Sequence, residues 1–180
     1  MNFRTYLILS VFSWGAIVFS GCSSRSSREY LLEHLLALSA EAEVKLLGLT
    51  PQTEQTRAIV KSLARCLKKR LYRESAPRGI VRTLNYFVYT QWRMVPIVDT
   101  TTVENTILTR VIQTQQGSCL GLTGLYLVIG EQIGLPLVAI CLPGHVFLQY
   151  QGERDTITVS YTHLRAHETS LHLVCRLLLE

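Results

Sequence analysis

The sequence lacks the cysteine pattern that metal and disulfide frameworks need. Its five cysteines include no C-x-x-C pair. Two of them, Cys22 and Cys175, lie in terminal segments of unusual composition, which leaves the odd set of Cys66, Cys119 and Cys141. Structural zinc sites use closely spaced ligands, and small disulfide scaffolds use an even number of cysteines. We therefore expect neither kind of framework, and no metal or cofactor.

The chain also lacks an apolar run long enough to cross a membrane comfortably. The longest candidate runs from Tyr6 to Phe19, follows a single positive charge at Arg4 and is broken only by small residues. A membrane-spanning helix needs about 20 apolar residues, whereas the apolar core of a secretory signal is shorter. Residues 1–21 are therefore predicted to be a signal peptide.

The junction after this run is Phe19-Ser20-Gly21-Cys22, and serines dominate residues 23–27. It resembles a bacterial lipobox, from which it departs at Phe19, where an aliphatic residue is usual. The resemblance implies cleavage before Cys22, acylation of its thiol by a fatty acid such as palmitate, and a tether over residues 22–28. Several acyl chains would anchor the protein stably to the cell envelope. Ser23 in place of Asp favours the outer membrane, on its periplasmic face if the source is Gram-negative. The alternative is an ordinary signal peptide or short anchor in which Cys22 is incidental.

Acidic residues are scarce between Arg57 and Arg82, where nine basic residues face only Glu74, in a chain of net charge +5. A solvated helix face is one interpretation. The other is contact with anionic lipid headgroups or an anionic wall polymer. The export signal argues against nucleic acid as a partner.

Apolar periodicity predicts a helical scaffold from residue 28 to residue 112. One helix over 29–47 ends at Gly48, and the next starts at Thr50-Pro51, where Thr is a helix cap and Pro suits the first turn. Cys66 falls on the apolar stripe of this second helix, so we expect it to be buried. The segment 76–79 reads as a break, and further helices are expected over 80–92 and 103–112.

The stretch 116–150 combines features that suggest chemistry. Gly117-Ser118-Cys119 opens an apolar helix expected over 120–133, and its glycines would allow a close neighbour. A buried strand over 137–142, a Pro143-Gly144 turn and an antiparallel strand over 145–150 follow. A helix N-terminus favours the thiolate form of Cys119, and His145 could take the thiol proton. For each residue alone, the competing interpretation is an ordinary buried thiol or a core histidine. Cys141 is expected to be core.

Gly-Ser-Cys at a helix start, Gly134-Leu135-Pro136 before a strand and Pro-Gly-His before the next strand resemble the transglutaminase-like superfamily, in particular its compact bacterial branch. The resemblance covers about residues 105–150, and more weakly the helices from Ile80 onward. It implies an α+β, papain-like core, with Cys119 as nucleophile, His145 as general base, and an acid, usually Asp, on the following strand. Asp155 comes too early in the sequence for that role. Gln113, six residues before Cys119, matches the papain-like spacing of an oxyanion donor, with Gln115 and Gln116 as competitors.

The tail from Val159 to Glu180 contains His163, His167, His172 and Cys175, which could suggest a metal-binding helix. We reject that interpretation because VSYTHLRAHET resembles an in-frame translation of a sequencing adapter, and LVCRLLLE the adjoining primer. The expected organisation is therefore a signal peptide (1–21), a tether (22–28), a truncated transglutaminase-like domain (29–158) and an artefactual tail (159–180). The natural protein would continue past Thr158 and supply the missing strand.

Two functions follow. The first is a membrane-anchored cysteine hydrolase or acyltransferase that acts on amide bonds of peptides or cell-wall peptides. The second is a non-catalytic lipoprotein interaction module that retains the fold.

Overall fold

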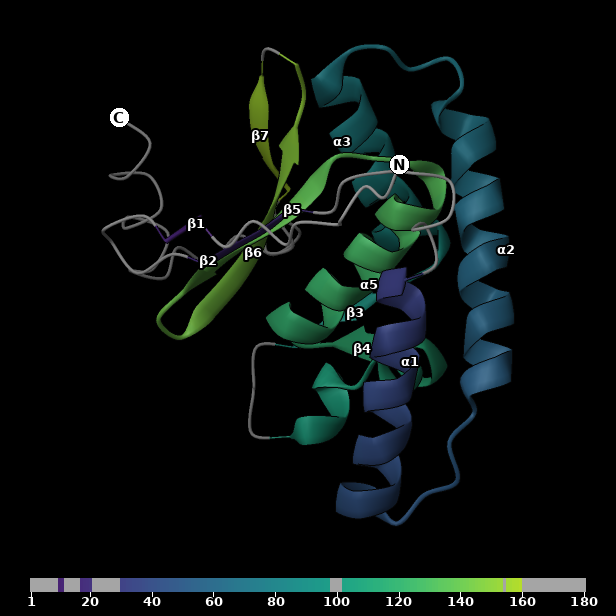
Figure 1. The fold of residues 1–180 in the computed structure, drawn as a ribbon. Coiled ribbons are helices and arrows are strands. Elements are labelled where there is room, and N and C mark those ends of the chain that lie inside the picture. The colour runs from purple at the N-terminus through teal and green to yellow at the C-terminus, as the bar shows by residue number, and fades with distance from the viewer. Residues whose placement is uncertain (1–9, 12–16, 21–29, 98–101, 154, 160–180) are drawn as a thin grey trace, which may run out of the picture.

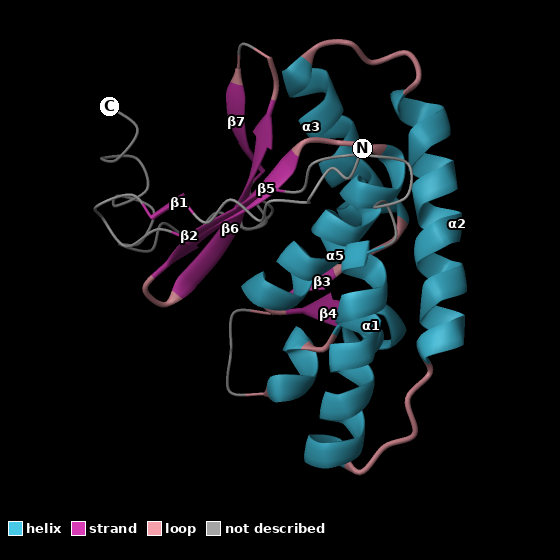
Figure 2. Cartoon of the chain, in the orientation of Figure 1, coloured by secondary structure: helices cyan, strands magenta, loops and turns pink. Residues whose placement is uncertain are grey.

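The computed structural model describes residues 10–11, 17–20, 30–97, 102–153 and 155–159. Helices precede most of the five-stranded sheet in the chain and gather on one side of it (Figure 1). This sheet and the helices form separate layers, and the short strands β3 (Val95–Pro96) and β4 (Gln116–Gly117) lie among the helices (Figure 2). This segregation with antiparallel pairing is the α+β arrangement predicted from the sequence. The predicted lipidation site Cys22 and residues 160–180 lie outside the described residues.

The first helix behaves as its periodicity predicts. Helix α1 (Tyr30–Ala42) continues into a π-helical turn, η1 (Glu43–Leu47), and ends at Gly48. Gly48 has a φ of 64° and donates its N–H to the carbonyl of Glu43, which is a left-handed C-cap.

Helix α2 (Thr53–Leu71) starts later than predicted. Its N-cap is Gln52, with a φ of −106° and a ψ of 52°, so Pro51 stays outside the helix. Its buried residues, Thr56, Val60, Ala64 and Leu67, define the face toward the core. Cys66 lies off this face and is exposed, so the prediction that it is buried was wrong.

Residues 76–79, predicted to be a break, instead start helix α3 (Pro77–Asn85). Pro77 takes the first helical position, where its missing N–H would have no partner anyway. A π-helical turn, η2 (Tyr86–Gln91), extends this helix.

The region predicted as one helix over 103–112 is divided. A 3₁₀ turn, η3 (Val103–Thr106), is followed by extended Ile107 and then by helix α4 (Leu108–Thr114). A two-residue parallel pairing of β3 (Val95–Pro96) with β4 (Gln116–Gly117) had no sequence signal.

Helix α5 (Cys119–Ile133) is the centre of the core. Eight of its residues are buried, and Leu122, Leu125, Tyr126, Val128 and Ile129 are completely so. The hydroxyl of Tyr126 donates to Asn85 Oδ1 at 2.9 Å, which explains the polar residue in α3. Gly130 allows Leu137 to approach, since a Cβ there would lie 2.7 Å from Leu137 Cδ1.

The sheet has the order β1-β2-β5-β6-β7 and is antiparallel throughout. Strands β5 (Leu137–Leu142) and β6 (His145–Gln151) form the predicted hairpin, and β7 (Thr156–Val159) pairs with β6. The strand after the histidine strand therefore begins within the described residues, earlier than predicted. Strands β1 (Ser10–Val11) and β2 (Ile17–Ser20) lie within the predicted signal peptide, and cleavage before Cys22 would leave β5 at the sheet edge.

Candidate active site

The start of α5 is built around a buried serine. Ser118 is the N-cap, with a φ of −69° and a ψ of 174°, and its Oγ accepts from the N–H of Gly121 at 3.3 Å. Its own N–H donates to the carbonyl of Asn105 at 2.8 Å. Cys119 follows as the first helical residue and is half-buried. The thiol therefore lies at a helix N-terminus, where the positive end of the helix dipole favours an anion.

Asn105 was missed by sequence reasoning, although its carbonyl fixes the helix start. A Cβ on Gly121 would lie 2.2 Å from that carbonyl oxygen and 2.7 Å from Val111 Cγ2. Glycine is thus the only residue that lets η3 approach the first turn of α5 so closely. Among the described residues, nothing accepts a hydrogen bond from the N–H of Cys119 or Leu120. These two groups are available to an oxyanion.

The segment before the cysteine is held by the short parallel pairing. Val95 donates its N–H to the carbonyl of Gln115, and Ile97 to that of Gly117, both at 2.8 Å. Gln115 has a φ of 56°, and its Nε2 donates to the carbonyl of Trp92 at 2.8 Å. One of the two N–H groups of its side-chain amide is therefore occupied by a structural bond.

The other two glutamines remain candidates for an oxyanion donor. Gln113 is exposed at the end of α4, and its Oε1 accepts from Arg110 Nη1 at 2.9 Å. This contact uses the oxygen and leaves the amide N–H groups unused among the described residues. Gln116 is exposed in β4. The role of Gln113 stays a prediction.

His145 opens β6 directly after the turn. Gly144 has a φ of 76°, which suits the third position of a tight turn whose second residue is proline. His145 pairs with Leu142 in the hairpin and is half-buried. Its ring stacks on that of Phe147, with centroids 6.3 Å apart and planes 20° apart.

Cys119 and His145 reach the same end of the layer formed by α5 and the sheet. Helix α5 has 15 residues, so it is about 22 Å long, and the six-residue β5 returns about 20 Å along it. Figure 1 shows the β5–β6 turn and the start of α5 toward the same end, away from α3.

The structure does not join the two side chains. No hydrogen bond links Cys119 to His145 among the described residues. By strand alternation His145 shares a face with Phe147 and Gln149, whereas Leu148 and Tyr150 are buried in the core that α5 lines. Phe147 is partly buried and also packs against this core. A working pair would need the imidazole to turn toward α5.

The third residue of a triad would have to come from β7 near His145. The register pairs Leu148 with Val159 and Gln151 with Thr156. His145 therefore lies beyond the described end of β7, and Asp155 lies at the far end of the hairpin. Asp155 instead lines an open hollow of about 290 Å³ with Pro77 and Arg78.

Among the described residues, the other cysteines and acids form no second candidate centre. Cys66 is exposed on α2 and Cys141 is half-buried in β5. In the part of the chain that the structure describes, no three His, Cys, Asp or Glu side chains are placed to hold a metal ion. Within the same residues, no helix is long and apolar enough to span a membrane. His163, His167, His172 and Cys175 lie outside the described residues.

A comparison with protein families matches residues 54–166 to the transglutaminase-like superfamily, which is more than half of the chain. The chain belongs to this superfamily. The match begins in the first turn of α2 and includes both Cys119 and His145. Comparisons with curated proteins and with solved structures each found no match. The transglutaminase-like domain is generally a fold of cysteine hydrolases or acyltransferases, and it agrees with the α+β arrangement of helices and antiparallel sheet.

Proposed function

We propose that this transglutaminase-like protein is a cysteine hydrolase or acyltransferase that acts on amide bonds of peptides, anchored to the cell envelope through Cys22. The observation that carries the proposal is Cys119 at the first position of a Ser118-capped helix, with unused N–H groups beside it. Cell-wall peptides are the substrates that fit an exported enzyme of this kind.

The chemistry balances with the groups present. Cys119 Sγ attacks the amide carbon while its proton passes to His145, and the carbonyl oxygen becomes an oxyanion. The N–H groups at the start of α5 stabilise this oxyanion. The C–N bond then breaks as His145 returns the proton to the leaving amine. A water molecule, deprotonated by His145, attacks the thioester and releases the acid, or an amine attacks in its place.

His145 must approach Cys119 for this sequence. Catalytic hydrogen bonds are often long or misaligned without substrate, so the separation does not exclude the pair. The turn at Gly144 is where the strand start could rotate.

The chain contains its own control for a test of Cys119. Cys66 is an exposed thiol on a helix face away from the candidate site, so its alkylation rate is a reference for Cys119. Peptide mapping after iodoacetamide treatment of the Cys22→Ala full chain would give the rate at each cysteine as a function of pH.

We expect Cys119 to be alkylated faster than Cys66, and His145→Ala to remove the difference. Amide hydrolysis and amine incorporation by membranes that contain the protein should be lost in Cys119→Ala and kept in Cys66→Ser. Equal alkylation rates for the two thiols, together with unchanged activity in Cys119→Ala, would reject the enzyme. Labelling with radioactive palmitate that persists in Cys22→Ala would reject the anchor.

The second candidate is a non-catalytic interaction module. The stacking of His145 on Phe147, on the sheet face away from Leu148, favours it. In that case His145→Ala would leave the alkylation of Cys119 unchanged.

A further inference from the structure

The end of the molecule formed by the second half of α2 and by α3 carries an exposed basic surface. On α2, this surface lies on the side of the helix opposite the buried residues Val60, Ala64 and Leu67. The exposed cations of this basic end are Arg65, Lys68, Lys69, Arg70, Arg73, Arg78 and Arg82. None of them forms an ion pair with a described carboxylate. The same region has a single acid, Glu74.

Two tyrosines stand among these cations. Tyr72, directly after α2, is 89% exposed, and Tyr86 is 54% exposed one turn after Arg82. A tyrosine ring prefers a boundary that is apolar on one side and wet on the other. Lysine and arginine alone would suit any polyanion, but exposed aromatic rings beside them suit the headgroup region of a membrane.

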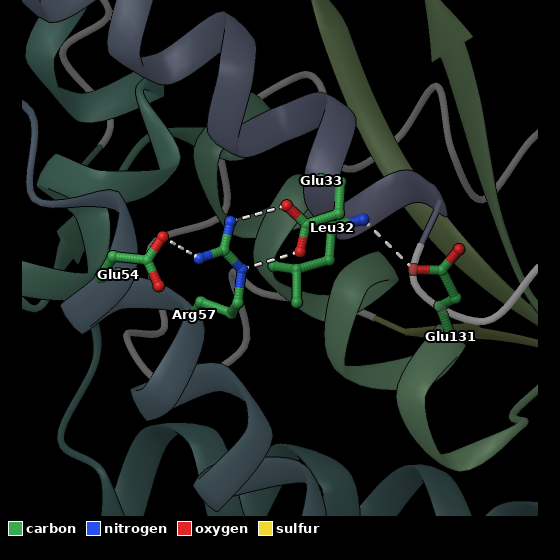
Figure 3. Close-up of polar contacts among 5 residues, drawn as sticks. All are labelled: Leu32, Glu33, Glu54, Arg57 and Glu131. Atoms are coloured by element: carbon green, nitrogen blue, oxygen red, sulfur yellow. Dashed lines mark hydrogen bonds and ion pairs between the residues drawn. The ribbon is translucent and has the colours of Figure 1, made fainter.

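The position of α1 relates this surface to the proposed anchor. Arg57 on α2 donates from Nε and Nη2 to the two carboxylate oxygens of Glu33, both at 2.7 Å, so the first turn of α1 is level with Arg57 (Figure 3). Helix α2 continues past Arg57 to Leu71, about 21 Å, whereas α1 extends back only to Tyr30, about 4.5 Å. Figure 1 shows α2 passing the start of α1 toward the end that carries α3.

The basic end therefore overhangs the start of α1 by about 16 Å. The tether from Cys22 to Tyr30 can span at most about 28 Å. A protein anchored at Cys22 could thus place the basic end on the membrane without strain. The distance between the basic end and Cys22 matters only if the protein carries the proposed anchor. The charges and the tyrosines of the basic end are independent of that anchor.

We propose that the basic end of α2 and α3 binds an anionic phospholipid surface. Each basic residue near such a surface adds to the attraction, so several together outweigh the cost of fixing the orientation. Cys119 lies at the opposite end of α5 from Glu131, which contacts the start of α1. The bound orientation therefore turns the candidate active site away from the membrane, toward substrates in solution.

Cys66 reports on this contact because it is exposed on α2 next to Arg65. The experiment uses the full-length protein, purified from membranes and reconstituted into vesicles of phosphatidylcholine alone or with added phosphatidylglycerol. The readout is the rate at which a membrane-impermeant maleimide modifies Cys66, with Cys119 as the internal reference. We expect phosphatidylglycerol to slow the maleimide modification of Cys66 roughly fivefold or more. Salt at about 0.5 M should restore the rate.

The triple variant Arg65→Gln/Lys69→Gln/Arg73→Gln should lose this protection, and Tyr72→Ser should weaken it. Lys45→Gln, which removes an exposed cation of η1 that pairs with Glu41, is the matched control and should keep it. Equal Cys66 rates in both vesicle types would overturn the proposal. So would protection by soluble polyphosphate with none by phosphatidylglycerol, which would indicate a wall polymer instead. The mass of the N-terminal peptide reports acylation of Cys22 separately, so failure of the anchor and failure of the surface are distinguishable.

Discussion

Gly121 is the residue on which the geometry around Cys119 depends most closely. An alanine Cβ would overlap the carbonyl oxygen of Asn105 and press on Val111. We expect Gly121→Ala to lower the free energy of unfolding by about 1–3 kcal/mol, because backbone must move to make room. Urea denaturation measures this change.

Gly124 in the same helix is the matched control. A Cβ there would meet only Leu35 Cδ1, at an ordinary contact distance of 3.5 Å. Gly124→Ala should be neutral or stabilising by up to about 1 kcal/mol, because alanine favours a helix interior. Equal losses in the two variants would show that the contact with Asn105 does not restrict position 121.

The pair of Glu33 with Arg57 should make stability depend on pH in the acid range. The hydrogen bonds from Arg57 hold the pKa of Glu33 below its usual value. The pair therefore stabilises the fold fully at pH values above the pKa of glutamate in the unfolded chain, about 4.3. This stabilisation is lost as the pH falls through the lower pKa that Glu33 has in the folded protein.

Glu33→Gln should thus lower the free energy of unfolding by at most about 1 kcal/mol at pH 7, because the pair is partly exposed. Near pH 3 it should lower it by almost nothing. Urea midpoints of both proteins across this range give the comparison. Glu153→Gln removes an exposed acid that has no hydrogen bond or ion pair among the described residues, so its urea midpoint at pH 7 should match that of the parent. A difference for Glu33→Gln that stays constant down to pH 3 would contradict the assigned role of Arg57.

At the scale of elements, the start of α1 is held by a residue distant in sequence. Glu131 of α5 accepts from the N–H of Leu31 at 2.9 Å and of Leu32 at 3.2 Å (Figure 3 draws the contact to Leu32). A carboxylate there replaces a local cap and complements the helix dipole. We expect Glu131→Ala to lower the free energy of unfolding by about 1–2 kcal/mol. Glu131→Gln should lower it by about half as much, because the amide keeps an acceptor oxygen.

Hydrogen exchange would locate the effect of the Glu131 variants. The amides in the first turn of α1 should exchange faster in Glu131→Ala, while those in the middle of α2 change only with global stability. Unchanged protection in α1 would show that another group caps it.

Local signals predicted the elements that are governed by local rules. The left-handed glycine after α1, the apolar helix after Cys119 and the hairpin around Pro143-Gly144 all follow from residue type and period. Proline was ambiguous because it can end or start a helix: Pro51 stayed outside α2, while Pro77 opened α3. The cap from Glu131, the Asn105 carbonyl and the β3–β4 pairing join distant segments, so no local pattern could predict them.

At the scale of the whole molecule, the candidate site could be predicted only as a pair of residues. The Gly-Ser-Cys and Pro-Gly-His motifs identified Cys119 and His145, and the family match includes both. The face on which His145 lies depends on strand register, because one residue of shift reverses every side chain. Register is fixed by packing of the entire sheet on α5 and is invisible in the motif.

The same register yields a prediction about Asp155, the first aspartate after the histidine strand in the described part of the chain. Because Gln151 pairs with Thr156, Asp155 lies about seven positions along β6 from His145, or roughly 24 Å away. No side chain reaches across that distance. Asp155→Asn should therefore leave the pH profile of Cys119 alkylation unchanged, whereas His145→Ala should alter it. A profile in which Asp155→Asn matches His145→Ala would mean that β7 pairs with β6 in a different register, since only a large slip could bring this carboxylate to the imidazole.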